Sequence, residues 1–86
     1  MRNISFEPGA FEDYVNWSKT NRKIFDKINK LFQQVSRTPF SGEGKPEPLK
    51  GNFKGCWSVR IDQQNRIIYM VYDKEVKIIS YRGHYE

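Results

Sequence analysis

The chain is poor in residues that cross-link proteins or bind metals. It contains one cysteine, Cys56, and one histidine, His84, among its 86 residues. A single cysteine excludes an internal disulfide and is typical of proteins kept in a reducing cytoplasm. One cysteine and one histidine are also too few for the usual zinc ligand sets. We therefore expect a cytoplasmic protein without a metal site.

Long apolar runs are absent as well. The opening residues 1–6 (MRNISF) lack the apolar segment of a secretory signal, and no later stretch is long and apolar enough for a membrane span. We expect neither a signal peptide nor a membrane partner. Apolar residues make up 37% of the chain and aromatic residues 15%, which is enough for one packed core. We predict a single domain over residues 1–86.

Positive charge is in excess and unevenly distributed. The formal net charge is +5, but residues 14–60 alone hold ten lysines and arginines against three acids. Part of this excess falls on a predicted helix that carries Lys23, Lys27 and Lys30. A solvated helix face with ordinary lysines is one interpretation. Because the excess continues into the loop that bears Glu47, we favour a phosphate backbone as the partner.

The apolar pattern predicts the order strand, helix, helix and three strands, written βααβββ. Residues 3–6 are typical of a short strand, and Pro8 suits the first turn of a helix over residues 8–19. Thr20 or Asn21 can cap a second helix that ends near residue 37. The second helix has one continuous apolar face, which we assign to the core. The residues of that face are Ile24, Ile28, Leu31, Phe32 and Val35.

Residues 38–55 hold three of the four prolines and four of the six glycines, so we expect no helix or strand there. A loop of this length is usually either functional or disordered. A flexible linker is one interpretation. The apolar side chains of Phe40, Leu49 and Phe53 favour the other, an ordered loop that holds Glu47 and Lys50 in position.

The last third of the chain alternates like a half-buried sheet. In the strand predicted over residues 56–61, Trp57 and Val59 share one face while Ser58 and Arg60 share the other. Residues 62–65 predict a turn, and residues 66–72 are apolar on both faces, which is typical of a central strand. A final strand is expected over residues 75–81. Arg66 begins the central strand, where it could reach a ligand or pair with Asp62 in the turn.

Several of these segments together resemble a known family. They are residues 37–40 (RTPF), 45–50 (KPEPLK), 57–61 (WSVRI) and 65–69 (NRIIY), and the closing pair His84 and Tyr85. In content and spacing they resemble the YoeB (Txe) branch of the RelE/ParE toxin superfamily, over essentially the whole chain. Members are toxins of bacterial toxin–antitoxin pairs that enter the ribosomal A site and cleave messenger RNA. The resemblance implies an α+β, microbial-ribonuclease-like fold, with two N-terminal helices on one side of a curved antiparallel sheet and the active site on the other.

The resemblance also implies roles for the catalytic residues. Glu47 would be the base that removes the 2′-hydroxyl proton, Arg66 the main phosphate clamp and His84 the acid that protonates the leaving 5′-oxygen. Tyr85 would orient the nucleotide or the phosphate. This chemistry needs no metal and no cofactor. From the residues alone, Glu47 could equally be an ion-pair partner of a neighbouring lysine, Lys45 or Lys50 of the same loop.

Cations would bind RNA in two groups. Lys45, Lys50 and Arg60 would add positive charge around the reacting phosphate, and the helix lysines Lys23, Lys27 and Lys30 would contact the ribosome.

The chain departs from the family pattern at four positions. Val59 stands where an arginine is common, and Gly51 and Asn65 replace residues that are often histidine. Glu86 extends the chain beyond the usual terminal tyrosine. These departures bear on potency more than on the type of reaction.

The resemblance implies three partners: a cognate acidic antitoxin of the YefM/Axe kind, the bacterial ribosome with its mRNA, and a second copy in a homodimer, since toxins of this branch often form dimers. The expected location is the bacterial cytoplasm. Two alternatives remain within the same fold, a ParE-like gyrase poison and a non-catalytic RNA-binding module. The combination of Glu47, Arg66 and His84 favours the nuclease.

Overall fold

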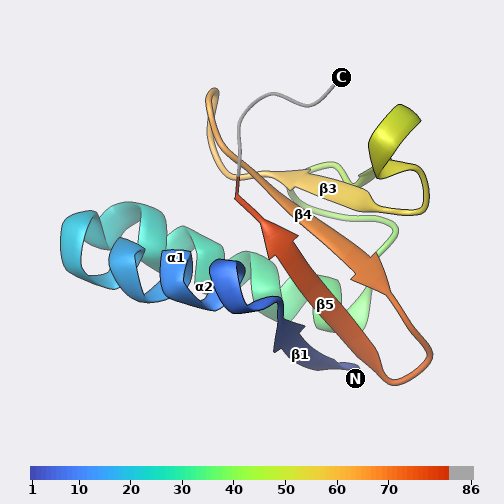
Figure 1. Ribbon diagram of the computed structural model, residues 1–86, viewed down its shortest axis with the longest axis horizontal. Helices are drawn as coiled ribbons and strands as arrows, with labels where there is room; N and C mark the ends of the chain where they lie inside the picture. Colours follow the sequence, from blue (N-terminus) through green and yellow to red (C-terminus); the bar gives the residue numbers. More distant parts are fainter. Residues whose placement is uncertain (82–86) are drawn as a thin grey trace.

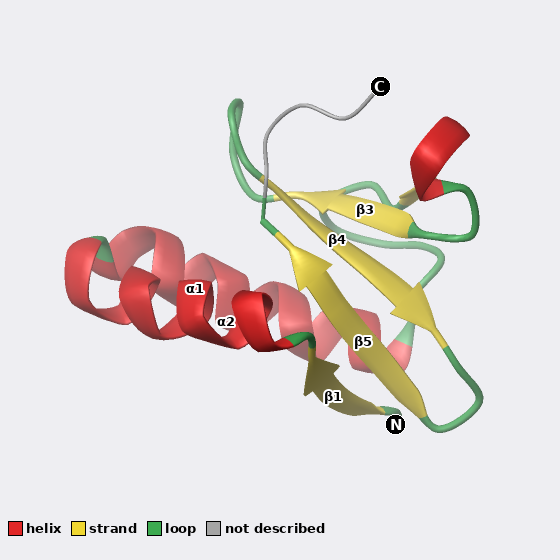
Figure 2. Ribbon diagram, in the orientation of Figure 1, coloured by secondary structure: helices red, strands yellow, loops and turns green. Residues whose placement is uncertain are grey.

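The structure is a computed structural model that describes residues 1–81 (Figure 1). Its long helices are α1 (Pro8–Thr20) and α2 (Arg22–Arg37). Its strands are β1 (Asn3–Phe6), β2 (Glu47–Pro48), β3 (Trp57–Arg60), β4 (Arg66–Val71) and β5 (Glu75–Ser80), and a short 3₁₀ helix spans Gly51–Phe53. The two long helices lie side by side against one face of the sheet (Figure 2). The predicted α+β class and the one-sided helix layer are confirmed.

The helix boundaries follow the predicted signals. Pro8 opens α1, where its missing N–H has no intrahelical partner to lose. Asn21 caps α2, because its side-chain oxygen accepts a hydrogen bond from the backbone N–H of Ile24 at 3.1 Å. No helix within residues 1–81 is long and apolar enough to cross a membrane.

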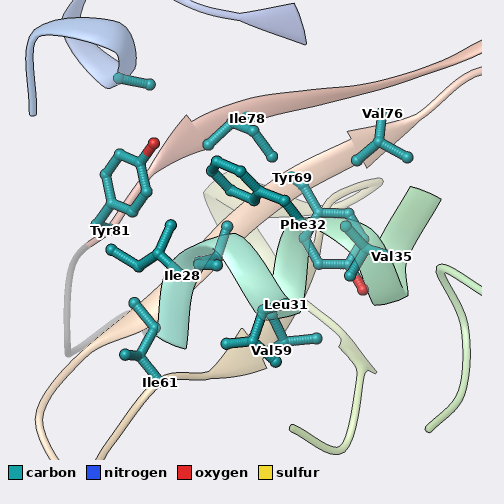
Figure 3. Close-up of a cluster of buried hydrophobic side chains, with 12 residues drawn as sticks. Ile28, Leu31, Phe32, Val35, Val59, Ile61, Tyr69, Val76, Ile78 and Tyr81 are labelled. Carbon is teal, nitrogen blue, oxygen red and sulfur yellow. The ribbon is translucent and has the colours of Figure 1, made fainter. Parts of the chain in front are cut away.

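The core lies between α2 and the sheet (Figure 3). The apolar face of α2 is buried as predicted, with Ile24 at its edge only partly covered. Val59 and Tyr69 from the sheet meet this face, and both are fully buried. Full burial of one such side chain contributes about 1.5–3 kcal/mol, so this layer fixes the sheet on the helices.

The sheet has the strand order β1-β5-β4-β3-β2, which makes β4 central as predicted. The expectation of a wholly antiparallel sheet is wrong at one edge, because β1 pairs with β5 in parallel. All the other pairs are antiparallel. Two helices and three strands separate β1 from β5 along the chain, so no hairpin turn imposes an antiparallel pairing on them.

The loop between α2 and β3 is more structured than the sequence predicts. Glu47 and Pro48 form β2 opposite Ser58 and Trp57, and a 3₁₀ turn follows. The expectation that no strand or helix forms there is therefore wrong. An edge strand tolerates Pro48, because an outward-facing position has no ladder hydrogen bond to lose.

The same loop is fastened to the rest of the fold at several points. The Nε2 of Gln34 on α2 donates to the carbonyl oxygens of Ser41 and Glu43, and the backbone N–H of Arg60 donates to the carbonyl of Gly44. The ordered-loop interpretation is thus confirmed over the flexible linker. The segment that carries Glu47 is held between α2 and β3.

Candidate active site

The site is built on the face of the sheet that the long helices leave open. The strand register sets Glu47 opposite Ser58 and Arg60 opposite Arg66. Paired residues share a face of the sheet, and neighbours along a strand alternate between faces. Since Val59 points into the helix-covered core, these four side chains belong to the opposite face.

Glu47 and Arg66 are in direct contact on this face. The Nη1 of Arg66 lies 2.5 Å from the Oε1 of Glu47, and the same nitrogen donates to the Oγ of Ser58 at 3.1 Å. The Glu47 side chain is 53% exposed and that of Arg66 25%, whereas Ser58 is completely buried. The residues that the resemblance assigns as base and phosphate clamp therefore lie side by side.

Glu47 and Arg66 pair with each other and not with the alternative partners that the sequence suggests. Among residues 1–81 Glu47 forms no ion pair with a lysine, and Arg66 forms none with Asp62. The Oδ1 of Asp62 instead accepts hydrogen bonds from the backbone N–H groups of Gln64 and Asn65, at 2.8 and 2.7 Å. Asp62 thus holds the predicted turn that leads into Arg66.

Ser58 is the site residue that sequence reasoning missed. The alternation of residues 56–61 places it on the face of Arg60, but nothing in the sequence gives it a role. Its only sequence signal is a small polar residue on a mostly apolar strand, and its partner across the sheet depends on a register that the sequence does not reveal.

The predicted RNA-binding cations take no part in the Glu47–Arg66 ion pair. Lys27 of α2, Lys45 of the loop and Arg60 of β3 line a common hollow of about 300 Å³. Lys50 is exposed just before the 3₁₀ turn, and Lys23 and Lys30 are exposed along α2. Within the part of the chain described, none of these six cations forms an ion pair. They remain available for an anionic partner.

Comparison with known proteins identifies the family. The family described as "YoeB-like toxin of bacterial type II toxin-antitoxin system" matches residues 6–85. The chain belongs to this family. It is 45% identical over 85 residues to the toxin RelK of Mycobacterium tuberculosis, which covers 99% of this chain and 100% of the relative. The YoeB resemblance is therefore confirmed.

Solved structures agree with this assignment. The chain is similar to a YoeB-YefM complex from Staphylococcus aureus, with 43% identity, a TM-score of 0.88 and coverage of 99% of both chains. A YoeB dimer from the same species matches with 42% identity, a TM-score of 0.89 and coverage of 98% of both chains. This YoeB-family toxin thus shares its whole architecture with these two structures.

Three titratable groups of the toxin have shifted pKa values that bear on the site. Burial raises the pKa of Asp62, but hydrogen bonds from Gln64 and Asn65 and the charge of Lys27 outweigh it, so the pKa lies below its usual value. Burial raises the pKa of the Cys56 thiol, which disfavours the reactive thiolate. Burial also raises the pKa of Tyr69, whose hydroxyl donates to the carbonyl of Pro39 at 2.5 Å.

The predicted acid His84 and its neighbour Tyr85 lie outside the described residues. The chain is described up to Tyr81, which is buried in the core (Figure 3). A bulge in β5 precedes it, since Ile68 pairs with Ser80 and Tyr69 with Ile78. The extra residue shifts the alternation of side chains and lets Tyr81 face the core. Within residues 1–81 no three His, Cys, Asp or Glu side chains gather as metal ligands would.

Proposed function

We propose that this YoeB-family toxin is a ribosome-dependent endoribonuclease that cleaves mRNA and so stops translation. One observation carries the proposal: Glu47 contacts Arg66 above the buried Ser58, on the open face of the sheet. A carboxylate beside a guanidinium is what attack by a 2′-hydroxyl requires, a proton acceptor next to a group that neutralises the phosphate.

The reaction proceeds by proton transfer at two oxygens. Glu47 takes the proton of the 2′-hydroxyl, and the 2′-oxygen forms a bond to the phosphorus. Arg66 stabilises the negative charge of the pentavalent phosphate, because its planar fork can donate two hydrogen bonds and stays charged. The bond to the 5′-oxygen then breaks, and His84 supplies the proton that this oxygen takes up. General acid–base groups contribute about 10²- to 10⁴-fold each, so the pair can supply much of the rate without a metal.

The remaining cations bind RNA. Lys45, Lys50 and Arg60 contact phosphates near the scissile bond, and Tyr85 orients the nucleotide. Lys23, Lys27 and Lys30 follow each other at i, i+4 and i+7 on the exposed face of α2, a spacing that puts them on one side of the helix. This row of charges contacts ribosomal RNA.

In the cell the toxin is held by an acidic antitoxin of the YefM kind, whose C-terminal segment covers the open face of the sheet. The YoeB-YefM complex of the S. aureus relative supports this partner, and the YoeB dimer of that species supports a homodimer. Both toxin and antitoxin act in the bacterial cytoplasm, where the ribosomes are.

The test is the chemistry of the cut ends. Purified toxin and ribosomes programmed with a defined mRNA should yield a 2′,3′-cyclic phosphate and a 5′-hydroxyl. Cleavage should persist after magnesium is chelated, provided that the ribosomal complex has been stabilised by other means. A 5′-phosphate end would overturn the proposal, because it requires an activated water in place of the 2′-hydroxyl.

A further inference from the structure

Ser58 occupies an unusual place for a hydroxyl group. It lies on β3 between Trp57 and Val59, it is completely buried, and across the sheet it faces Glu47. Ser36 is the only other buried polar residue within residues 1–81, and its hydroxyl donates to the carbonyl of Gln33 on its own helix. The Ser58 oxygen instead accepts from a long side chain of another strand, the Nη1 of Arg66 at 3.1 Å.

This bond determines which edge of the Arg66 guanidinium stays open. Nη1 carries two hydrogens, and Glu47 and Ser58 accept one each. The N–H groups of Nε and Nη2 have no hydrogen-bond partner among residues 1–81. One N–H of Nη2 points the same way as that of Nε, so the two form a fork for two oxygens of one phosphate.

The two partners of Nη1 behave differently during the proposed reaction. Glu47 loses its negative charge when it takes the 2′-hydroxyl proton, and its attraction for Arg66 weakens. The Ser58 hydroxyl is neutral throughout, and its buried place on β3 keeps it from following the substrate. The hydrogen bond from Nη1 to Ser58 therefore persists through proton transfer, while the one to Glu47 weakens.

We propose that Ser58 is a positioning residue of the active site. It holds Nη1 of Arg66 from below and so keeps the Nε–Nη2 edge turned toward the phosphate while Glu47 exchanges its proton. This role rests on the proposed nuclease function. Ser58 itself touches neither the substrate nor the reacting atoms.

The decisive variant is Ser58→Ala, which removes the hydroxyl and adds no atoms to a filled site. Single-turnover cleavage on programmed ribosomes should slow by about 10- to 100-fold, the factor that one lost hydrogen bond to a charged group corresponds to. The concentration of ribosomes that gives half the maximal rate should stay the same, because binding of the ribosome does not involve Ser58. The matched control is Ser36→Ala, which removes the other buried serine hydroxyl, away from the site.

A second measurement is independent of cleavage. In toxin with ¹⁵N-labelled arginine, the rotation of the Arg66 guanidinium about its Nε–Cζ bond can be followed from exchange between its two Nη signals. Rotation should be slow in the wild type and in Ser36→Ala, and clearly faster in Ser58→Ala. Thermal unfolding of each variant verifies that the comparison is made between folded proteins.

The outcomes separate the positioning role from the nuclease itself. If wild-type toxin does not cleave mRNA, the proposed function fails, and the rotation measurement still tests the hold on Arg66. If Ser58→Ala cleaves at the wild-type rate, or leaves the rotation unchanged, the positioning role is wrong. If Ser36→Ala slows cleavage as much as Ser58→Ala, general loss of packing explains the effect and the proposal is overturned.

Discussion

The contact between Glu47 and Arg66 is close but only partly shielded from water. The two side chains are 53% and 25% exposed. Ion pairs that solvent reaches contribute about 0–1 kcal/mol, so this one adds little to the stability of the fold. When a phosphate binds the open Nε–Nη2 edge of Arg66, Glu47 can therefore leave the guanidinium at small cost. Glu47 is then free to accept the 2′-hydroxyl proton.

We expect Glu47→Gln, Arg66→Ala and His84→Ala each to slow single-turnover mRNA cleavage by roughly 10²-fold or more, because each removes a group that acts in the transition state. Binding to the ribosome should change little. The measurement is cleavage with toxin in excess over programmed ribosomes, together with a separate binding assay.

Glu43→Gln is the matched control for Glu47. Glu43 lies in the same loop and its side chain is exposed, and within residues 1–81 only its backbone carbonyl is used, as an acceptor for Gln34. The Glu43→Gln variant should cleave mRNA at the wild-type rate. An equal drop in cleavage rate in both glutamine variants would mean that the total charge of the loop matters and that the position of Glu47 does not.

Helix α2 has a buried side that belongs to the core and an exposed side that we propose to bind RNA. Its buried side supplies Ile28, Leu31 and Val35 to the core, and all three are completely covered. Its exposed side carries the lysine row, whose members form no ion pair within residues 1–81. Substitutions on the exposed side can thus change RNA binding without changing the core.

Replacing Lys23, Lys27 and Lys30 together by glutamine should weaken binding to ribosomes and flatten its dependence on salt. Each lost phosphate contact reduces the steepness of log K against log salt by about 0.7–0.9, so three contacts reduce it by roughly 2–3. The control replaces Lys19, Lys54 and Lys74, which are exposed elsewhere and remove the same charge. If the control lowers the slope equally, net charge and not the α2 row is responsible.

The loop that presents Glu47 depends on Gly44. Gly44 has a φ of +79°, and a Cβ added there would lie 3.1 Å from Leu31 Cδ2 and from Val59 Cβ. Gly55 has a similar φ of +97°, but among residues 1–81 an added Cβ would meet nothing within 4 Å. Both positions therefore need a positive φ, but only at Gly44 would an added Cβ be crowded by neighbouring side chains.

Gly44→Ala should therefore destabilise the fold by about 1–3 kcal/mol more than Gly55→Ala, since only the former adds overpacking to the strain of a left-handed alanine. Urea unfolding of both variants measures this difference. Gly44→Ala should also cleave more slowly, because the loop must shift and Glu47 lies three residues beyond it. Equal unfolding free energies would show that the loop is not pressed against the core at Gly44.

Charge is segregated over the molecule as a whole. Of the ten cations between residues 14 and 60, Lys19 lies on α1, and the other nine lie on α2, on the loop that follows it and on β3. A cationic surface around an exposed site attracts an acidic, initially disordered segment. Such a segment would cover the catalytic groups as it folds onto them.

We expect association with the acidic antitoxin to be fast and salt-sensitive, and its dissociation to depend on apolar contacts. Hydrogen exchange of the free toxin and of the complex tests where the antitoxin lies. Exchange over residues 42–54 should slow in the complex because the Glu47 loop becomes covered. Unchanged exchange there would indicate an antitoxin that blocks entry to the ribosome from another surface.

Local patterns were sufficient for much of this fold. The 3.6-residue spacing of apolar side chains identified the buried face of α2, and a strand apolar on both faces identified β4 as central. The cap at Asn21 and the turn at Asp62 could be read from their own residues, because these signals act within a few positions of the chain. Glu47 and Arg66 were named from motifs that resemble the YoeB family.

Contacts between segments far apart in the chain could not be read in this way. The parallel pairing of β1 with β5 and the short β2 depend on where the chain returns after its helices and loop. The contact of Arg66 with Glu47 and Ser58 joins three strands, and it exists only because their register sets these residues side by side. Residue types and their spacing therefore specified the helices, the central strand and the candidate chemistry. Strand register, which depends on packing of the whole sheet against α2, determined that the proposed base and the proposed clamp meet over a buried serine.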